Sequence, residues 1–274
     1  MINKDFKLKA KTYPFPYIVI DDFFEKEFYS KLELEFPHSK SFKTNSVNRM
    51  HGDTTFGDQL YEDLISNSIT YKSLHEWVYS KKFVEYFLKF FKLDINSQKE
   101  LIDDPIKFKI VPTPIEIGQV FNIENYEKNK NDPFLFPRLD LGYGKKNYGV
   151  NTGGNGPHID NPQRLISILI YIGGYKNIAG GEHRIYEKIK NELKIFETIK
   201  PIRNRLVASL QNNEAFHGVN PVTDLIGQRN AFYLAISSTK KIWKSSKRNK
   251  LNIKYNKNRV EKSLIKKLFL KIFN

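Results

Sequence analysis

The stretch that decides the fold is Gly156-Pro-His-Ile-Asp-Asn-Pro162, with Arg164-Leu-Ile-Ser-Ile-Leu-Ile-Tyr-Ile172 close behind it. In an extended chain, side chains two residues apart point to the same face, so His158 and Asp160 are expected to lie side by side. Residues 165–172 are apolar on both alternating faces, as expected for a strand that is covered on both sides. The stretch therefore predicts a buried strand that begins beside a polar pair able to share a metal ion.

Short apolar segments separated by Gly, Asn and Pro surround this strand. Charged and apolar residues alternate at 138–143, and further strands are expected at 182–186, 193–199, 205–210, 216–221 and 229–237. Short strands at this density favour a double-stranded β-helix, or jelly roll, over alternating β and α units. The predicted class is mainly β with packed helices (α+β).

Helices are expected in the N-terminal part of the chain. A β-branched run at 16–20 predicts a strand, and Asp21-Asp22 is suited to cap a helix over 23–36. Residues 60–91 predict one or two helices with an aromatic stripe that packs on a sheet. The polar segments 45–58 and 122–137 predict loops, the second able to close over a site, and 105–120 predicts short strands.

These elements predict one domain over residues 1–239, with a jelly-roll core at about 105–239 and helical support at about 21–100. The remainder, 240–274, is a basic extension with 13 of the 45 Lys and Arg residues and one of the 30 acids, which places +12 of the net charge of +15 there. At 260–273 apolar residues cover one side of a predicted helix and lysines the other. Such a helix can lie on an anionic membrane or dock on the domain itself, and both alternatives stay open.

Composition excludes several classes of protein and site. The chain has no Cys, which excludes disulfides, thiolate metal sites and Cys nucleophiles. No apolar segment approaches the roughly 18 residues that span a bilayer, and the N-terminus lacks the apolar core of a signal peptide. We expect a cytoplasmic protein without a transmembrane segment, with peripheral membrane contact through 258–274 as the alternative.

Two further polar residues extend the His-X-Asp pair into a candidate site. His217 is a suitable third ligand, and two His with one carboxylate leave metal positions open, as in non-haem Fe(II) oxygenases. Arg229 opens a strand that is otherwise apolar on the same face. A buried guanidinium without a partner is costly, and a ligand carboxylate would satisfy it. Together these residues suit a dicarboxylate with one end on the metal and the other on the Arg.

Several motifs together carry a family resemblance. They are His158-Ile-Asp-Asn-Pro162, Ile168-Leu-Ile-Tyr-Ile172, Gly180-Gly-Glu182, His217-Gly-Val-Asn-Pro-Val222 and Arg229. The set resembles the Fe(II)/2-oxoglutarate-dependent oxygenases, particularly the branch that contains the prolyl hydroxylases. The resemblance covers about 138–237, and the segment 16–37 is similar to the family's N-terminal strand and helix.

The resemblance implies an enzyme, a dioxygenase that hydroxylates an unactivated C–H bond. Its metal ligands would be His158, Asp160 and His217, and its cofactors Fe(II), 2-oxoglutarate as cosubstrate and O2, with ascorbate as a supporting reductant. Arg229 would bind the distal carboxylate of the cosubstrate. Decarboxylation of 2-oxoglutarate to succinate accompanies the hydroxylation in this family.

Tyrosines and other histidines receive weaker assignments. Tyr171 matches a family tyrosine that hydrogen-bonds the distal carboxylate, and Tyr148 matches another on the cosubstrate side, with Tyr143 as its competitor. His183 is expected at the surface or beside the ligands rather than as a ligand. The remaining histidines, His38, His51 and His75, receive no role in chemistry.

The substrate stays open between several classes. A nucleic acid is disfavoured, because the second Arg typical of the family's nucleic-acid demethylases is Ala235 here and the positive charge gathers at the far terminus. A sugar, a surface glycolipid or a polysaccharide precursor is favoured if the C-terminal helix binds membrane, with Arg138, Arg164 and Asn161 as substrate contacts. A prolyl-type protein hydroxylase and a non-catalytic jelly-roll module that binds sugar are the alternatives.

Overall fold

Two facing sheets form the centre of the molecule. The computed structural model describes residues 1–42, 51–99, 101–113, 132–148, 155–190 and 192–244. Among these residues, eight strands form the larger sheet, in the order β1-β2-β10-β7-β12-β5-β3 with β4 beside β5. Its strands are β1 (Lys7–Lys11), β2 (Tyr17–Asp21), β3 (His51–Thr55), β4 (Lys109–Ile110), β5 (Phe134–Gly144), β7 (Arg164–Gly180), β10 (Leu206–Leu210) and β12 (Val222–Ser238).

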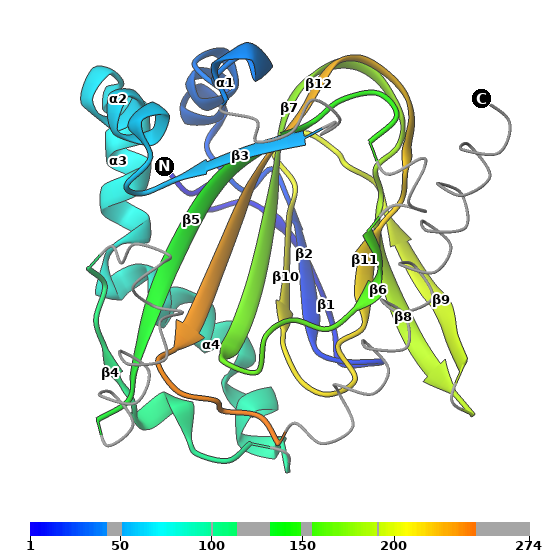
Figure 1. Cartoon of the computed structure of the whole chain (residues 1–274). Helices are drawn as coiled ribbons and strands as arrows, with labels where there is room; N and C mark the ends of the chain where they lie inside the picture. Colours follow the sequence, from blue (N-terminus) through cyan, green and yellow to red (C-terminus); the bar gives the residue numbers. More distant parts are fainter. Residues whose placement is uncertain (43–50, 100, 114–131, 149–154, 191, 245–274) are drawn as a thin grey trace, which may run out of the picture.

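The smaller sheet has the order β6-β11-β8-β9 within the described part of the chain. Its strands are β6 (Asn155–His158), β8 (His183–Ile189), β9 (Glu192–Ile199) and β11 (His217–Val219). Figure 1 shows this sheet on one side of the larger one, with the strands of the two sheets joined by long connections at the top. The arrangement confirms the predicted jelly-roll core.

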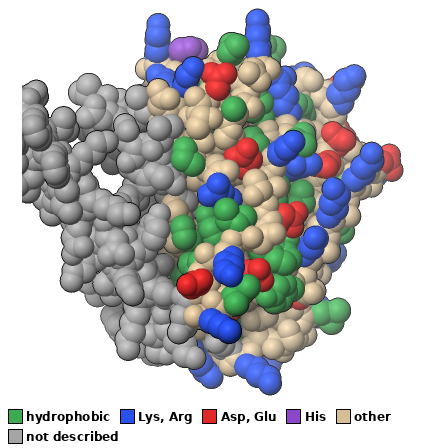
Figure 2. Space-filling view, turned by 90° about the vertical axis from the view of Figure 1, so that its right-hand side faces the viewer, with side chains coloured by type: hydrophobic (Ala, Val, Ile, Leu, Met, Phe, Trp, Pro, Cys, Tyr) green, Lys and Arg blue, Asp and Glu red, His purple; other side chains and the backbone are tan. Residues whose placement is uncertain are grey.

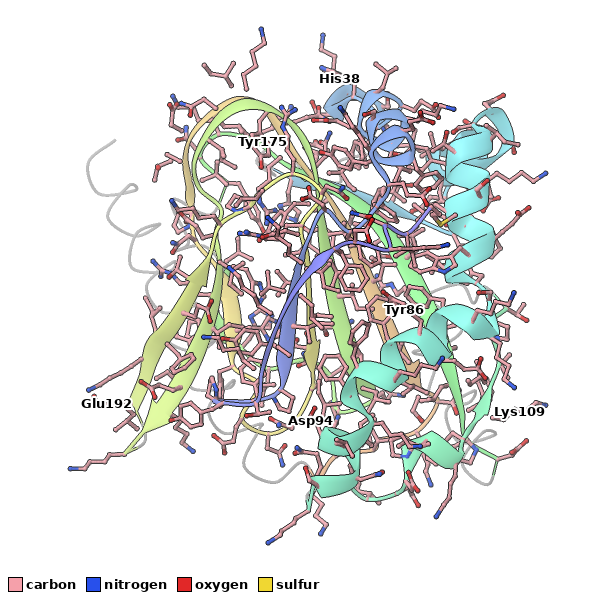
Figure 3. All side chains as sticks on the ribbon, turned by 180° about the vertical axis from the view of Figure 1, so that it is seen from behind. His38, Tyr86, Asp94, Lys109, Tyr175 and Glu192 are labelled. Carbon is pink, nitrogen blue, oxygen red and sulfur yellow. The ribbon has the colours of Figure 1, made fainter. Side chains whose placement is uncertain are left out.

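The helices cover the other side of the larger sheet (Figure 1). They are α1 (Lys26–Leu34), α2 (Gln59–Asn67), α3 (Ile69–Val78) and α4 (Lys81–Ser97), with 3-10 turns η1 (Ser39–Ser41) and η2 (Pro105–Lys107). Figure 3 shows α4, marked by Tyr86 and Asp94, lying across the back of this sheet. None of the described helices is long and apolar enough to cross a membrane.

Alternation along the central strands builds two apolar layers. Phe232 of β12 packs toward the helices, in the same cluster as Leu32 and Phe87, while its neighbour Ala231 faces the layer between the sheets. That inner layer also contains Ile159. It encloses the end of β6, where the His-X-Asp motif lies, so the fold delivers the candidate site to the space between the sheets.

The two longest strands, β7 and β12, pair along most of their length and bend together. Irregular register at Gly227 marks the bend. This residue has φ of +108°, and a Cβ there would lie 2.3 Å from the carbonyl oxygen of Gly174. Only glycine allows the two backbones to approach so closely at this conformation. The bend turns the far ends of both strands toward the smaller sheet (Figure 1).

Two sequence predictions for the N-terminal half are wrong in detail. Residues 60–91 were expected to form one or two helices, and the structure has three, because Ser68 and Ser80 each cap a new helix. The Ser68 hydroxyl accepts from the Tyr71 N–H at 3.0 Å, and the Ser80 hydroxyl accepts from the Phe83 N–H at 3.3 Å. The proposed cap Asp21-Asp22 is also wrong. Asp21 ends β2 and accepts from Arg205, and α1 begins after Glu25.

Two expected loops contain strands. Within 45–58 the described part includes β3, a polar strand at the edge of the larger sheet that pairs with β5 and carries no apolar run. Phe134 to Pro137, assigned to the loop 122–137, belong to β5. Most of the proposed lid 122–137, namely residues 122–131, and the C-terminal segment 258–274 lie outside the described residues.

Candidate active site

Three potential metal ligands meet between the sheets. His158 on β6 and His217 on β11 are direct partners across the two strands, with ring centroids 4.5 Å apart. Asp160 follows two residues after His158, and one ligand atom from each of the three residues lies within 4.8 Å of the others. The structure therefore brings the three predicted ligands together, so that two imidazole nitrogens and one carboxylate oxygen face a common point.

Backbone carbonyls orient both imidazoles. His158 hydrogen-bonds the Gly156 carbonyl through Nδ1 at 2.9 Å, and His217 hydrogen-bonds the Ala215 carbonyl through Nδ1 at 3.0 Å. A carbonyl oxygen can only accept, so Nδ1 carries the proton in each ring. The Nε2 lone pairs remain available for a metal ion, which is the usual arrangement for a ligating histidine.

The protonation states also suit metal binding. Burial lowers the pKa of His217 to about 4, although Asp160 opposes the shift. Burial alone would raise the pKa of Asp160, but the charge of Arg164 and the neighbouring histidines hold it below its ordinary value. At neutral pH His217 is thus uncharged and Asp160 is a carboxylate, the forms that ligate metal without first losing a proton.

Asp160 is held by two side chains. The Ser167 hydroxyl donates to Asp160 Oδ2, and Arg164 Nη1 lies 3.1 Å from the same oxygen. Ser167 lies on the inner face of β7, where the otherwise apolar run has its polar residue. Two His and one well-held carboxylate fit Fe(II) with open coordination positions.

Arg229 on β12 is a buried cation with unsatisfied atoms. It is 1% exposed, its guanidinium lies 5.0 Å from the centre of the Tyr171 ring, and its Nη1 donates to the Tyr233 hydroxyl at 3.3 Å. Its Nε and Nη2, and the Tyr171 hydroxyl, are buried without a hydrogen-bond partner among the described residues. Burial raises the pKa of Tyr171 to about 12 against the opposing charge of Arg229, so the tyrosine is a neutral donor. These orphaned donors fit a ligand carboxylate.

A cavity of about 190 Å³ opens beside Arg229. At roughly 30 Å³ per water it has room for about six water molecules. Tyr143 and Tyr148, the two competing cosubstrate tyrosines, both line it, and Tyr233 forms another wall. A larger groove, of about 650 Å³, lies between α4 and β4 and shares no lining residue with this cavity.

The predicted substrate contacts already have protein partners. Arg138 makes a two-pronged ion pair with Asp140, at 2.9 and 2.7 Å, and Arg164 pairs with Asp160. Asn161 accepts from the Gln163 N–H at 3.1 Å within a local turn. Their roles toward a substrate stay a prediction.

Sequence reasoning missed several residues of the site. His51 and Asp53 line the cavity from β3, which was expected to be loop, and Asp140 lines it from β5. His183 was expected either at the surface or beside the ligands, and the structure places it beside a ligand: it is 7% exposed and its ring stacks on the His217 ring at 5.5 Å and 27°. Its position after Gly180-Gly181-Glu182 was the available signal.

We compared the chain with models of protein families and with curated proteins. The family model of the 2OG-Fe(II) oxygenase superfamily matches residues 145–235. A comparison with curated proteins gave no match.

Solved structures of similar proteins share little sequence with the chain. A prolyl 4-hydroxylase structure from Phytophthora capsici has 18% identity and a TM-score of 0.47, over 81% of this chain and 58% of that one. A 2OG-Fe(II) oxygenase family oxidoreductase from Burkholderia pseudomallei has 11% identity and a TM-score of 0.46, over 83% and 86%. A prolyl-4-hydroxylase from Pseudomonas putida has 12% identity and a TM-score of 0.43, over 81% and 92%.

The family match covers the segment that carries both histidines, Asp160 and Arg229. The metal cluster and the orphaned donors around Arg229 fit the Fe(II) and 2-oxoglutarate that this superfamily uses. The resemblance drawn from the sequence motifs is thereby confirmed: residues 145–235 are similar to the 2OG-Fe(II) oxygenase superfamily.

Proposed function

We propose that the chain is an Fe(II)- and 2-oxoglutarate-dependent dioxygenase that hydroxylates an unactivated C–H bond. One observation carries the proposal. A cluster of two histidines and a carboxylate shares the space between the sheets with a buried guanidinium that has two unpartnered nitrogens. Such a pair of sites suits a metal ion and a diacid at the same time.

Each residue has a part in this arrangement. His158, Asp160 and His217 would hold iron, and Arg229 with Tyr171 would hold the distal carboxylate of 2-oxoglutarate. The iron and cosubstrate together supply the activation of O2. Tyr148 would lie on the cosubstrate side, at the end of the cavity beside Gly144, where a Cβ would contact the Tyr148 ring at 3.6 Å.

The chain's own residues orient the ligands and exclude water. Arg164 and Ser167 both contact Oδ2 of Asp160, which restricts the rotation of the carboxylate. Apolar side chains between the sheets, including Leu169 and Phe216, keep the surroundings dry. In a site of low polarity the interactions of Arg229 with a carboxylate gain strength.

The test is uncoupled turnover and cosubstrate binding. With Fe(II) and O2, the protein is expected to convert 2-oxoglutarate to succinate at a rate that a chelator abolishes. Under anaerobic conditions, addition of Fe(II) and 2-oxoglutarate is expected to give a weak visible absorption band. Absence of both signals, with retention of sugar binding, would instead support a non-catalytic sugar-binding module.

For the substrate we infer a sugar or a polyhydroxylated glycan precursor. Tyr233 is 38% exposed although it lies on the central strand β12, and its ring covers Gly142 of the neighbouring strand, where a Cβ would be only 2.7 Å away. Asp53 lines the same cavity, whereas the Asp140 carboxylate there is already paired with Arg138. An aromatic face with a carboxylate acceptor suits a ligand that has C–H faces and many hydroxyl donors. A screen of glycans and prolyl peptides, read by substrate-stimulated succinate formation, distinguishes this class from protein hydroxylation.

A further part of the proposal concerns location. Ile242 and Trp243 are fully buried in the core of the domain, so the segment proposed to bring the enzyme to an anionic membrane surface is 258–274. Figure 2 shows lysine and arginine side chains spread over one side of the described molecule with hydrophobic ones between them, rather than in a single patch. Co-sedimentation with anionic vesicles, compared between the full chain and a variant without 258–274, tests whether the terminal segment is responsible.

A further inference from the structure

Two side chains of β12, Arg229 and Tyr233, reach toward each other above the small Ala231. β12 pairs with β5 without a register shift from Arg229 to Ser238, so alternate residues share a face, and Arg229 and Tyr233 both line the cavity. Four positions along a strand separate their Cα atoms by about 13 Å. The hydrogen bond from Arg229 Nη1 to the Tyr233 hydroxyl, at 3.3 Å, therefore requires both side chains to extend along the strand.

The Tyr233 ring is held against β5. A Cβ on Gly142 would lie 2.7 Å from Cε2 and 3.2 Å from Cδ2 of this ring, so the ring fills the space that a larger residue would need. The φ of Gly142 lies outside the left-handed region, so glycine serves here to make room for the ring and not to permit the backbone conformation. Gly142 thus fixes the ring in the position that presents its hydroxyl to Arg229.

The contact with Tyr233 determines which edge of the Arg229 guanidinium is free. Nη1 lies on the Cδ side of the planar group, so Nε and Nη2 share the other edge. These two nitrogens are the ones that are buried without a hydrogen-bond partner among the described residues. Two N–H donors along one edge match the two oxygens of a carboxylate.

Arg229 is held in this orientation before any ligand binds. Its stem passes under the turn at Gly181, where a Cβ would lie 3.1 Å from Cδ. Its guanidinium lies 5.0 Å from the centre of the Tyr171 ring, and Tyr233 accepts from Nη1. A free arginine side chain has many rotamers, and fixing one of them in advance lowers the entropy cost of binding.

We propose that Tyr233 is a positioning residue for cosubstrate recognition: its hydroxyl holds Nη1 of Arg229, so that the Nε and Nη2 edge is presented to the distal carboxylate. This inference rests on the proposed function, because it requires 2-oxoglutarate to bind at Arg229. Tyr233 acts through Arg229 and not by contact with the carboxylate. The exposed part of its ring stays available to the substrate.

Two variants test the hydroxyl and its placement separately. Tyr233→Phe keeps the ring and removes the acceptor for Nη1. Gly142→Ala keeps the hydroxyl, but its methyl group displaces the ring from β5. Tyr186→Phe is the matched control, because Tyr186 is buried in the layer between the sheets and lies on β8, opposite Ile195 of β9. Thermal unfolding of each variant checks that it folds.

The experiment is calorimetric titration of Mn(II)-loaded full-length protein with two ligands. One is 2-oxoglutarate, and the other is 2-oxopentanoate, which has the same chain length but no distal carboxylate; its weaker binding is measured by displacement of 2-oxoglutarate. We expect Tyr233→Phe and Gly142→Ala to weaken 2-oxoglutarate binding about three- to tenfold, the range for loss of one hydrogen bond. Binding of 2-oxopentanoate should stay unchanged, because it has no carboxylate for Arg229, and Tyr186→Phe should bind both ligands as the wild type does.

The two levels of inference fail in different ways. If Mn(II)-loaded wild-type protein binds no 2-oxoglutarate, the proposed function fails, and the role of Tyr233 fails with it. If the wild type binds 2-oxoglutarate and either Tyr233→Phe or Gly142→Ala binds it as tightly, only the role of Tyr233 is overturned. An equal loss of affinity for both ligands in Tyr233→Phe would overturn it as well, because the tyrosine would then act as a wall of the cavity and not through Arg229.

Discussion

His158 and His217 face each other across β6 and β11, with their ring centroids 4.5 Å apart. They are 59 positions apart in the sequence, so the contact depends on the register between two short strands. Both rings present Nε2 because a carbonyl two residues upstream accepts from Nδ1. The same local geometry at both positions explains how the pair presents two ligand nitrogens to one point in a sheet only four strands wide among the described residues.

Arg164 is expected to matter for metal affinity. Its replacement by Met removes the guanidinium that contacts Asp160 at 3.1 Å, so the carboxylate gains rotational freedom. Loss of such a supporting contact weakens metal binding by about 10–100-fold. Mn(II) titration of the metal-free protein measures the change. Arg138→Met is the control, since Arg138 pairs with Asp140, which is not in the metal cluster, and should leave Mn(II) affinity unaltered.

Arg229→Met is expected to weaken 2-oxoglutarate binding without lowering the stability of the ligand-free protein. The free protein buries a guanidinium whose Nε and Nη2 have no partner among the described residues, and Met fills a similar volume without that cost. The melting temperature of the ligand-free variant should equal or exceed that of the wild type. Affinity for 2-oxoglutarate should fall by about 100-fold or more, since a buried charge-assisted pair is lost. A clear loss of stability with unchanged affinity would contradict both expectations. Tyr171→Phe removes only the hydroxyl and should weaken binding by a smaller factor.

The stability of the metal-free protein should fall with pH below neutrality. Burial lowers the pKa of His217 from 6.5 to about 4. Between these two pH values His217 is protonated in the unfolded chain and neutral in the folded protein. The stabilisation from a neutral His217 is complete above pH 6.5 and is lost as pH falls from there through about 4, and it amounts to about 3 kcal/mol. The lowered pKa of Asp160 acts in the same direction at more acidic pH.

Urea unfolding at about pH 7.5, 6 and 4.5 measures how the free energy of unfolding depends on pH. These values span the window of about two to three pH units in which linkage predicts the loss of stability. His217→Gln lacks the titrating group and should show a flatter profile. An equally steep profile in that variant would assign the dependence to other groups.

The sequence allowed the metal ligands and Arg229 to be predicted because their signals are local. His158 and Asp160 are two residues apart, and Arg229 begins a run that is otherwise apolar on one face. The cavity residues His51 and Asp53 could not be found in this way. They lie on a polar edge strand whose pairing with β5 becomes visible only in three dimensions. The choice between a surface position and one beside the ligands stayed open for His183 for a similar reason, since its stacking against His217 becomes visible only in the folded chain.

The helical part shows a different limit. The aromatic stripe correctly placed helices against a sheet, but periodicity alone could not locate the breaks at Ser68 and Ser80. A serine inside a helical pattern can face solvent or cap a new helix, and packing decides between the two. Tyr71, whose N–H donates to Ser68, is itself anchored by donating its hydroxyl to the Leu32 carbonyl at 2.7 Å, a contact between distant helices.

Gly181 offers a test of how the turn before β8 positions Arg229. Gly181→Ala places a methyl group 3.1 Å from Arg229 Cδ and 3.2 Å from Val222 Cγ2, at φ of +73°. We expect a loss of about 1–2 kcal/mol in the free energy of unfolding from the left-handed backbone, and a weaker binding of 2-oxoglutarate because the arginine stem must shift. Gly57→Ala is the matched control, because Gly57 also has a positive φ, of +91°, but lies between β3 and α2, where its N–H donates to Glu62. Both variants should lose stability by urea unfolding, and only Gly181→Ala should lose 2-oxoglutarate affinity in calorimetry. Equal affinities in the two variants would mean that the Arg229 side chain adapts to the added methyl group, and that the glycine serves the backbone conformation alone.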